Sequence, residues 1–288
     1  MEKKFTLGML IVYLVLFAFS IACIVPLLIV LSASFSSQAA LNEYGFSVIP
    51  RAFTTEAYDY IINQPKVIIR AYGVTIFVTV AGTILSVLMN ALFAYPLARR
   101  SFMFRNPITF YVFFTMLFNG GLVPSYILIT RYLHLKDTIW VLFVPLLINA
   151  WYMLILRTFF KDLPEELIEA ATIDGAGEMR IFWGLIVPLS TPVLGTVGLF
   201  CTLGFWNDWF MGLLYIDSAH LKPLQLLLYN IQSAVTALQF KPFNVDVTPP
   251  AMTIRMATVV VTTGPLVFGY LFFQKYFVRG LTIGAVKG

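Results

Sequence analysis

The chain has 288 residues, of which 59% are hydrophobic and only 11% are charged, and its mean hydropathy is +0.85. A soluble domain carries about 25% charged residues, so this composition excludes an ordinary water-soluble fold. The formal net charge is +5 at pH 7, but no run of Lys and Arg exceeds two residues, which excludes a basic tract that follows a nucleic-acid backbone.

Six apolar segments are each long enough to cross a membrane, because roughly 20 helical residues cover about 30 Å of hydrocarbon. They predict an all-α integral membrane protein with six transmembrane helices in the lipid bilayer. The segment 223–240 is also free of charge, but its many polar side chains predict a helix on the outer surface instead of a seventh span. The predicted spans are Phe5–Asn42, Ala71–Ala98, Asn106–Thr130, Thr138–Leu156, Ile181–Asn207 and Met256–Gln274.

The distribution of Lys and Arg predicts the orientation of these spans. With both termini in the cytoplasm, eleven of the 19 Lys and Arg residues lie inside, in short segments, and eight lie outside. The outer regions are then 34–70 and 217–255. The inside set is Lys3, Lys4, Arg99, Arg100, Arg105, Arg157, Lys161, Arg180, Lys275, Arg279 and Lys287.

The loop between the fourth and fifth spans predicts a short cytoplasmic helix, Pro164–Asp174. We expect Asp162 as its N-cap, Glu165 and Glu166 in the first turn where the helix dipole favours them, and Gly175 at its end. An alternative is an amphipathic helix that lies on lipid headgroups. The acidic first turn argues against this alternative, because the cytoplasmic leaflet repels negative charge.

This loop resembles the EAA loop of ABC-importer permeases. The resemblance rests on Glu169-Ala170-Ala171, on Asp174-Gly175-Ala176 and on Pro188, which follows Leu185-Ile186-Val187. The family pattern has Ile and Leu where this chain has Leu185 and Val187, a mild departure. Three further segments resemble the carbohydrate-uptake (maltose-type, complex-saccharide) branch of the family: 119–124 (Asn-Gly-Gly-Leu-Val-Pro), 206–209 (Trp-Asn-Asp-Trp) and 276–288.

The resemblance covers residues 71–288 and implies a type I ABC-importer-like bundle in the cell membrane of a bacterium. It also implies the partners: an ATP-binding-cassette ATPase dimer, a second, homologous permease and an extracellular sugar-binding protein. The chain would pass an oligosaccharide or modified sugar inward and would not itself be an enzyme, since ATP is hydrolysed on partner chains. The residues that would couple it to the ATPase are Leu167, Glu169, Ala170, Ala171, Asp174, Gly175 and Pro188.

We divide the chain accordingly into three parts. Residues 1–70 form the first transmembrane helix and an extracellular loop, residues 71–278 form the transmembrane core, and residues 279–288 form a cytoplasmic tail. In maltose-type relatives the tail reaches between the ATPase subunits, which the resemblance implies for residues 280–288.

Several kinds of chemistry have no matching pattern in the sequence. There is no Gly-x-x-x-x-Gly-Lys-Ser/Thr loop to hold the phosphates of ATP. His134 and His220 lie in predicted outer loops and form no catalytic or metal-ligating pattern, so we expect no cofactor and no metal. No charged residue lies near the middle of any predicted span, which argues against an ion-coupled carrier.

Neutral polar residues are the candidates for a sugar path. Asn119 and Asn149 lie near the middle of their predicted spans, although interhelical hydrogen bonds explain such residues as well. Asp208 and Trp206 lie near the outer mouth, where simple interfacial placement is the alternative.

Gly120-Gly121 and Pro124 predict an interruption of the third span at Asn119. Two other functions remain open for the chain as a whole. One is a secondary (ion-coupled) sugar carrier, and the other is a membrane structural subunit without its own pathway.

Overall fold

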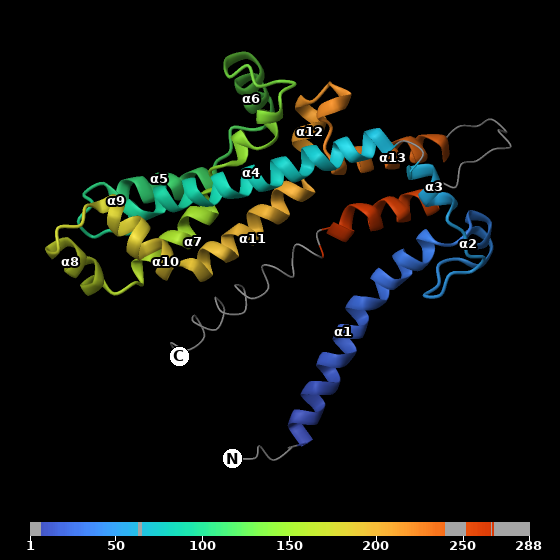
Figure 1. Ribbon diagram of the computed structural model, residues 1–288, viewed down its shortest axis with the longest axis horizontal. Coiled ribbons are helices and arrows are strands. Elements are labelled where there is room, and N and C mark those ends of the chain that lie inside the picture. Colours follow the sequence, from blue (N-terminus) through green and yellow to red (C-terminus); the bar gives the residue numbers. More distant parts are fainter. Residues whose placement is uncertain (1–6, 63–64, 240–251, 266, 268–288) are drawn as a thin grey trace. The chain divides into compact units, whose positions relative to one another are not determined.

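The computed structural model describes residues 7–62, 65–239, 252–265 and 267. Within these residues every regular element is a helix, which confirms the predicted all-α fold. The α-helices are α1 (Leu7–Ser34), α2 (Gln38–Tyr44), α3 (Glu56–Ile62), α4 (Pro65–Ala98), α5 (Arg105–Leu117), α6 (Leu122–Ile127), α7 (Ala150–Lys161), α8 (Glu165–Ile173), α9 (Glu178–Ile181), α10 (Val187–Leu189), α11 (Thr191–Asn207), α12 (Phe210–Tyr215) and α13 (Leu224–Gln239), and residues 252–265 are also helical (Figure 1). The π-helical segments are η1 (Leu128–Tyr132) and η4 (Phe182–Ile186), and the 3-10 turns are η2 (Ile139–Leu142), η3 (Val144–Leu146) and η5 (Ala219–Leu221).

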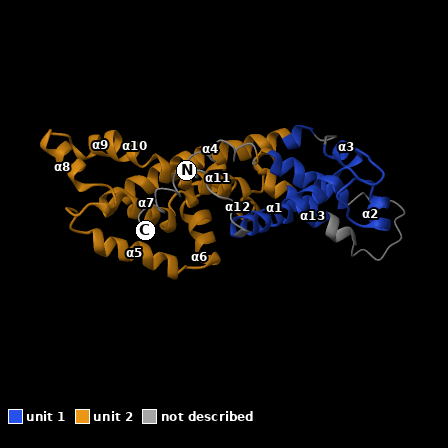
Figure 2. Cartoon of the chain, turned by 90° about the horizontal axis from the view of Figure 1, so that it is seen from below, with its two compact units in different colours: residues 1–68, 228–264 blue, residues 69–227, 265–288 orange. Residues whose placement is uncertain are grey.

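The chain divides into two compact units (Figure 2). Unit 1 contains residues 1–68 and 228–264, and unit 2 contains residues 69–227 and 265–288. In unit 1, Ala57 and Ile61 of α3 pack in a small buried cluster with Ile254 of the helix 252–265. The three-part division of the chain stays a prediction, and the predicted cytoplasmic tail lies outside the described residues.

Helix α1 is apolar, and its side chains are largely exposed except in the last turn, where Ser32, Ala33 and Ser34 are buried. The stretch Gly8–Ser34 has a mean hydropathy of 3.0, and none of its 18 most apolar consecutive residues is buried. Phe17, Phe19 and Leu27 are 65%, 68% and 66% exposed. A helix that is hydrophobic all round is typical of a membrane span.

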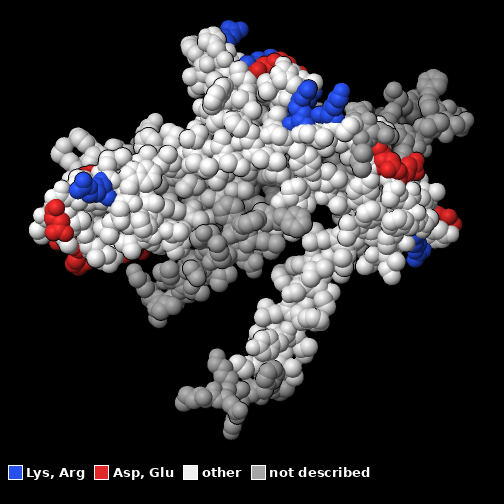
Figure 3. Space-filling view, viewed as in Figure 1, with Lys and Arg blue, Asp and Glu red and all other residues white. Residues whose placement is uncertain are grey.

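Among the described residues, two helices are long and apolar enough to cross a membrane unbroken: the stretch Gly8–Ser34 of α1, and α4. Three further pairs of helices are also long and apolar enough to cross a membrane if each pair is counted as one bent span. On the face drawn in Figure 3, charged side chains gather near the ends of elements and the middle of unit 2 is uncharged. The sixth predicted span begins within the helix 252–265 and ends outside the described residues.

The structure corrects the fourth and fifth predicted spans, which are bent instead of continuous. The chain bends by 47° between η3 and α7, near Asn149, and by 81° between α10 and α11, at Ser190. Pro145 lies at the start of η3 and Pro192 at the start of α11. Proline lacks a backbone N–H and its ring clashes with the preceding turn. Pro192 therefore explains why a new helix starts after Ser190, whereas Pro145 lies before the bend at Asn149 and accounts only for the start of η3.

Helix α4 packs in unit 2 through a narrow stripe of small and polar side chains. Gly82 lies against α11, where a Cβ atom on it would sit 2.9 Å from the Phe205 ring. Small residues of this kind let membrane helices approach closely. Other buried members of the stripe, at helical spacing, are Thr75, Thr79, Ser86 and Asn90.

Asn90 lies at the centre of unit 2 and has no exposed surface. Its Nδ2 donates to the backbone oxygen of Leu147 at 2.8 Å, and its Oδ1 accepts from the backbone N–H of Asn149 at 3.0 Å. These two backbone groups flank the bend between η3 and α7. The Ser86 hydroxyl also donates to the Leu147 carbonyl at 2.8 Å. Two side chains of α4 therefore bond to backbone groups at this bend, and Asn90 is the one that bonds on both sides of it.

Asp137 joins two loops of unit 2 that lie outside the predicted spans. Its carboxylate accepts hydrogen bonds from the backbone N–H groups of Asp217 (3.0 Å) and Ser218 (2.8 Å) and from the Ser218 hydroxyl (2.5 Å). Lys136 also pairs with Asp217 at 3.0 Å. The hydrogen bond from the Ser218 hydroxyl, followed by those from the backbone, holds the pKa of Asp137 below its usual value.

Replacing Asn90 with leucine tests its role at the bend. Asn90→Leu leaves the Asn149 N–H without its partner and removes one of the two donors to the Leu147 carbonyl, which keeps the Ser86 hydroxyl. A buried unsatisfied group costs about 1–3 kcal/mol. We expect a lower apparent melting temperature of the purified protein in detergent. Asn207→Leu is the matched control, because Asn207 is exposed at the end of α11. Equal melting temperatures for Asn90→Leu and wild type would contradict this role.

Replacing Asp137 with asparagine tests the loop contact and its pH dependence. The folded pKa lies below the unfolded value of about 3.9, so the charged carboxylate stabilises the fold above about pH 4 and loses this effect as the pH falls through the folded pKa. We expect Asp137→Asn to lower the melting temperature at pH 7, and we expect the difference in melting temperature between the variant and wild type to be smaller at pH 3. Asp59→Asn, an exposed carboxylate of unit 1, is the control. A difference as large at pH 3 as at pH 7 would show that charge is not involved.

Candidate coupling site

The predicted loop helix is present as α8, Glu165–Ile173. Pro164 is its N-cap residue, with φ −56° and ψ 123°, and Asp174 is its C-cap. The expectation that Asp162 caps the start of α8 is wrong. Asp162 instead ends α7, where its backbone N–H bonds to carbonyls of that helix. Proline has no side-chain oxygen to accept from the N–H groups of the first turn, so α8 begins without a side-chain cap.

Helix α8 is held to unit 2 by one deeply buried side chain. Ile168 is 5% exposed and belongs to the same buried cluster as Phe160 of α7 and Ile186 of η4. Ala171, one turn further along, is half-buried and packs against this cluster. The helix therefore rests on the helices that precede and follow it.

The rest of α8 is exposed, including its apolar side chains. Leu167 is 44% exposed, Ile173 is 86% exposed, and Met179 in the following helix is 61% exposed. Large exposed apolar side chains indicate a surface that contacts a partner protein or a membrane. Of the residues predicted to couple to an ATPase, Leu167, Glu169, Ala170, Asp174, Gly175 and Pro188 are all exposed.

Gly175 ends α8 in the left-handed conformation, with φ +78°. Its own N–H bonds to the Thr172 carbonyl at 3.0 Å, and the N–H of Ala176 bonds to the Ala171 carbonyl at 3.0 Å. This is the Schellman pattern of a helix C-terminus, which needs a residue that tolerates positive φ. A Cβ atom on Gly175 would meet nothing within 4 Å in this chain, so the backbone, and not crowding within the chain, calls for glycine.

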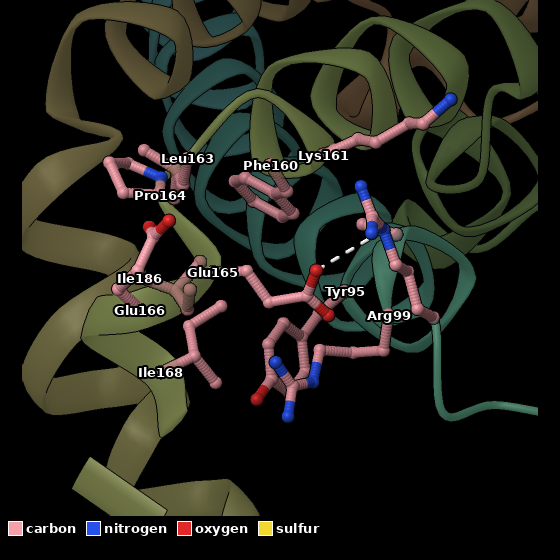
Figure 4. Close-up of a pocket in the computed structure, with 12 residues that line it drawn as sticks. Tyr95, Arg99, Phe160, Lys161, Leu163, Pro164, Glu165, Glu166, Ile168 and Ile186 are labelled. Carbon is pink, nitrogen blue, oxygen red and sulfur yellow. Dashed lines mark ion pairs between the residues drawn. The ribbon is translucent and has the colours of Figure 1, made fainter. Parts of the chain in front are cut away.

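A cavity of about 290 Å³ lies between α8 and the C-terminal end of α4 (Figure 4). Arg100 and Glu165 both line the cavity and form an ion pair at 3.2 Å. This ion pair is the dashed line that begins at Glu165 in Figure 4. The lining combines apolar side chains with charged ones: Phe160, Leu163, Ile168 and Ile186 with Arg99, Arg100, Lys161, Glu165 and Glu166.

Glu178, the first residue of α9, is a charged contact of this site that the sequence did not indicate. The Tyr95 hydroxyl donates to Glu178 Oε2, and Arg99 Nη2 lies 3.6 Å from Glu178 Oε1. Tyr95 and Glu178 are 83 positions apart in the chain. No local pattern reports a contact over such a separation.

Asn119 lies in the break between α5 and α6, where the chain bends by 109°. Its Oδ1 accepts from the backbone N–H of Gly121 at 2.7 Å, and Gly121 has φ +90°. The predicted interruption of the third span at Asn119 is therefore confirmed. The Asn119 side chain is exposed, and its place on a sugar path stays a prediction.

The other three path candidates serve local structure. Asn149 is the N-cap of α7 and accepts from Trp151 N–H at 2.9 Å, a capping pattern that was visible in the sequence. Asp208 accepts from the N–H of Met211, in α12, at 2.9 Å. Trp206 is 7% exposed and packs in a small cluster of unit 2. Their contact with substrate also stays a prediction.

Comparison with known proteins identifies close relatives of the whole chain. Residues 91–283 match the family "Binding-protein-dependent transport system inner membrane component". The chain is 41% identical to protein LplC of Bacillus subtilis, over 92% of this chain and 90% of that one. It is 37% identical to the polygalacturonan/rhamnogalacturonan transport system permease protein YtcP of the same organism, over 97% and 98% of the two chains.

The fold also matches a solved structure, that of a bacterial ABC transporter involved in the import of the acidic polysaccharide alginate. The TM-score is 0.80 and the sequence identity is 26%, and the match covers 96% of this chain and 100% of the other.

Replacing Gly175 with valine tests the helix end. In the left-handed region a residue with a Cβ costs about 1–2 kcal/mol, so we expect faster hydrogen exchange of the amides of Asp174, Gly175 and Ala176. Gly175→Asn should exchange more slowly than Gly175→Val, since asparagine tolerates this conformation. Gly177→Val should match wild type, because Gly177 has an ordinary φ of −72° and open space around it. Equal exchange in Gly175→Val and wild type would contradict the assignment.

Proposed function

The chain belongs to the family of inner membrane components of binding-protein-dependent transport systems, and from this premise we propose that it is the permease subunit of an ABC importer. It moves an oligosaccharide or modified sugar across the cell membrane of a bacterium. Its relatives include permeases named for polygalacturonan, rhamnogalacturonan and arabinooligosaccharides. Two of these names concern polymers of acidic sugars, so acidic oligosaccharides are the first substrates to try.

The exposed surface of α8 is the observation that supports coupling to an ATPase. The helix buries Ile168 in the core of unit 2 and presents Leu167, Glu169 and Ala170 outward. A helix held in this way moves with the elements on which it rests. We propose that an ATPase dimer binds this surface, with Glu169 as the leading polar contact, and that α7, α8 and η4 move as one body when the ATPase closes.

The remaining partners follow from the same proposal. A second, homologous permease completes the pathway, an extracellular sugar-binding protein delivers the substrate, and both termini lie in the cytoplasm. The exposed apolar sides of α1 and α5 suit lipid or this second permease, since Phe110 and Leu117 are 68% and 64% exposed. The chain itself is not an enzyme in this proposal, and Asn119, Asn149, Trp206 and Asp208 stay candidates for its substrate path.

The proposal is tested by reconstituting the complete complex into proteoliposomes. We expect ATP hydrolysis and sugar uptake to rise together when the binding protein is loaded with its saccharide, and uptake to require ATP. The saccharides to screen are oligogalacturonides, rhamnogalacturonan fragments, arabinooligosaccharides and maltose. Uptake that proceeds without ATP and follows an ion gradient would establish a secondary carrier. Absence of uptake under both conditions would leave a structural subunit.

Three variants separate coupling from transport as such. Glu169→Lys should reduce the amount of ATPase that copurifies with the permease, because it reverses the charge of the proposed contact. Gly175→Val should lower sugar-stimulated hydrolysis, whereas Gly175→Asn should retain it unless the ATPase backbone lies against this position. Normal assembly and normal stimulation in Glu169→Lys and Gly175→Val together would mean that α8 is not the coupling element.

A further inference from the structure

The C-terminal end of α4 is tied to the segment around α8 by contacts that the coupling proposal does not use. The Tyr95 hydroxyl and the Arg99 guanidinium both engage the carboxylate of Glu178, as a hydrogen bond and as an ion pair of 3.6 Å. Figure 4 shows Tyr95 and Arg99 side by side next to the cavity. Glu178 follows directly on the turn that ends α8, so it is part of the same connected segment.

Apolar packing of the Tyr95 ring accompanies the hydrogen bond between Tyr95 and Glu178. Tyr95 is 8% exposed, and its ring centroid lies 5.4 Å from that of Phe182, which is fully buried. Ile168 of α8 belongs to the same buried cluster. A third connection comes from α7, where Arg157 Nε donates to the Leu97 carbonyl at 3.0 Å. The last turn of α4 is therefore bonded to elements on both sides of α8.

The charged contacts here differ in how well water screens them. Arg100 and Glu165 are 75% and 40% exposed, so their ion pair is weakened by solvent. Glu178 is also 63% exposed, but its partner Arg99 is only 17% exposed and Tyr95 is buried. Hydrogen bonds to a charged acceptor are stronger than those between neutral groups. Of the two carboxylates that contact the last turn of α4 and the residues just after it, Glu178 therefore makes the less solvent-screened contact, and Glu165 the more screened one.

We propose that Glu178 is a positioning residue that fixes the α8 segment to α4, so that a displacement of α8 is passed to α4 as well as to α7 and η4. This inference rests on the proposed coupling function. It adds a third membrane helix to the moving body, and this helix carries Asn90, which bonds to both backbone groups at the bend before α7. Displacement of α8 thereby reaches the middle of the bundle.

The first experiment measures sugar transported per ATP hydrolysed in proteoliposomes of the complete complex. Glu178→Arg places a second positive charge beside Arg99 and removes the acceptor of the Tyr95 hydroxyl, so we expect this ratio to fall below that of wild type. In Glu178→Arg, the amount of ATPase that copurifies and the rate of ATP hydrolysis without sugar should stay near the wild-type values, because the exposed surface of α8 is unchanged. The exchanged pair Arg99→Glu with Glu178→Arg should restore much of the ratio.

Two milder variants locate the effect. Tyr95→Phe removes the hydroxyl and keeps the ring on Phe182, so the ratio should fall less than in Glu178→Arg. Glu165→Gln makes a neutral amide of the exposed acid and should affect the ratio less than Glu178→Gln. A wild-type ratio in Glu178→Arg, or no rescue by the exchanged pair, would overturn the proposal. Loss of ATPase binding in Glu178→Arg would assign Glu178 to docking and would overturn it too.

A second experiment does not depend on transport. Spin labels at Ile173 of α8 and Ile84 of α4, which are 86% and 62% exposed, report the distance between the two helices. Cys23 is exposed and is replaced by serine, whereas Cys201 is buried. Glu178→Arg should broaden this distance distribution and the exchanged pair should narrow it again. An unchanged distance distribution in Glu178→Arg would contradict the role proposed for Glu178, whether or not the protein transports sugar. If sugar does not stimulate ATP hydrolysis in the wild-type complex, the proposed function is contradicted instead.

Discussion

Every buried backbone N–H and carbonyl must find a partner within the protein, because hydrocarbon offers none, and this constraint shapes the core of unit 2. The bends are the places where the helix does not supply these partners. At the bend before α7, Asn90 bonds to the Leu147 carbonyl and the Asn149 N–H, and the Asn149 side chain then caps α7. At the break after α5, Asn119 accepts from the Gly121 N–H. Three asparagines thus allow bends that a lipid environment otherwise forbids.

The same requirement explains why polar residues within spans are ambiguous guides to a substrate path. Asn119 and Asn149 are the groups that the sequence offers for sugar, and both already bond to backbone. An amide that caps a helix still has other hydrogen-bonding positions, so structural use and substrate contact are compatible.

The proposed coupling segment, α8 with the turn at Gly175, is firmly attached to unit 2 on one side and exposed on the other. Ile168 is buried among α7 and η4, and Gly175 turns the chain back with two hydrogen bonds at the helix end. Leu167 and Ile173 are left exposed. Attachment on one side and exposure on the other are what a helix needs if it is to receive a force from a partner and pass it on. The contact of Glu178 with Tyr95 and Arg99 extends that attachment to α4.

The sequence alone determined the membrane class, the all-helical fold, the break at Asn119 and the position of α8, because hydrophobicity, glycine and proline act over a few residues. Its local pattern also contained the turn at Gly175. Only the tertiary structure decided that the fourth and fifth spans bend, that Asp162 ends α7, and that Asn90 and Glu178 join segments distant in the chain. Such contacts depend on which helices pack together, and packing is settled by the shape and hydrogen-bonding needs of all the neighbours at once, which no single stretch of sequence contains.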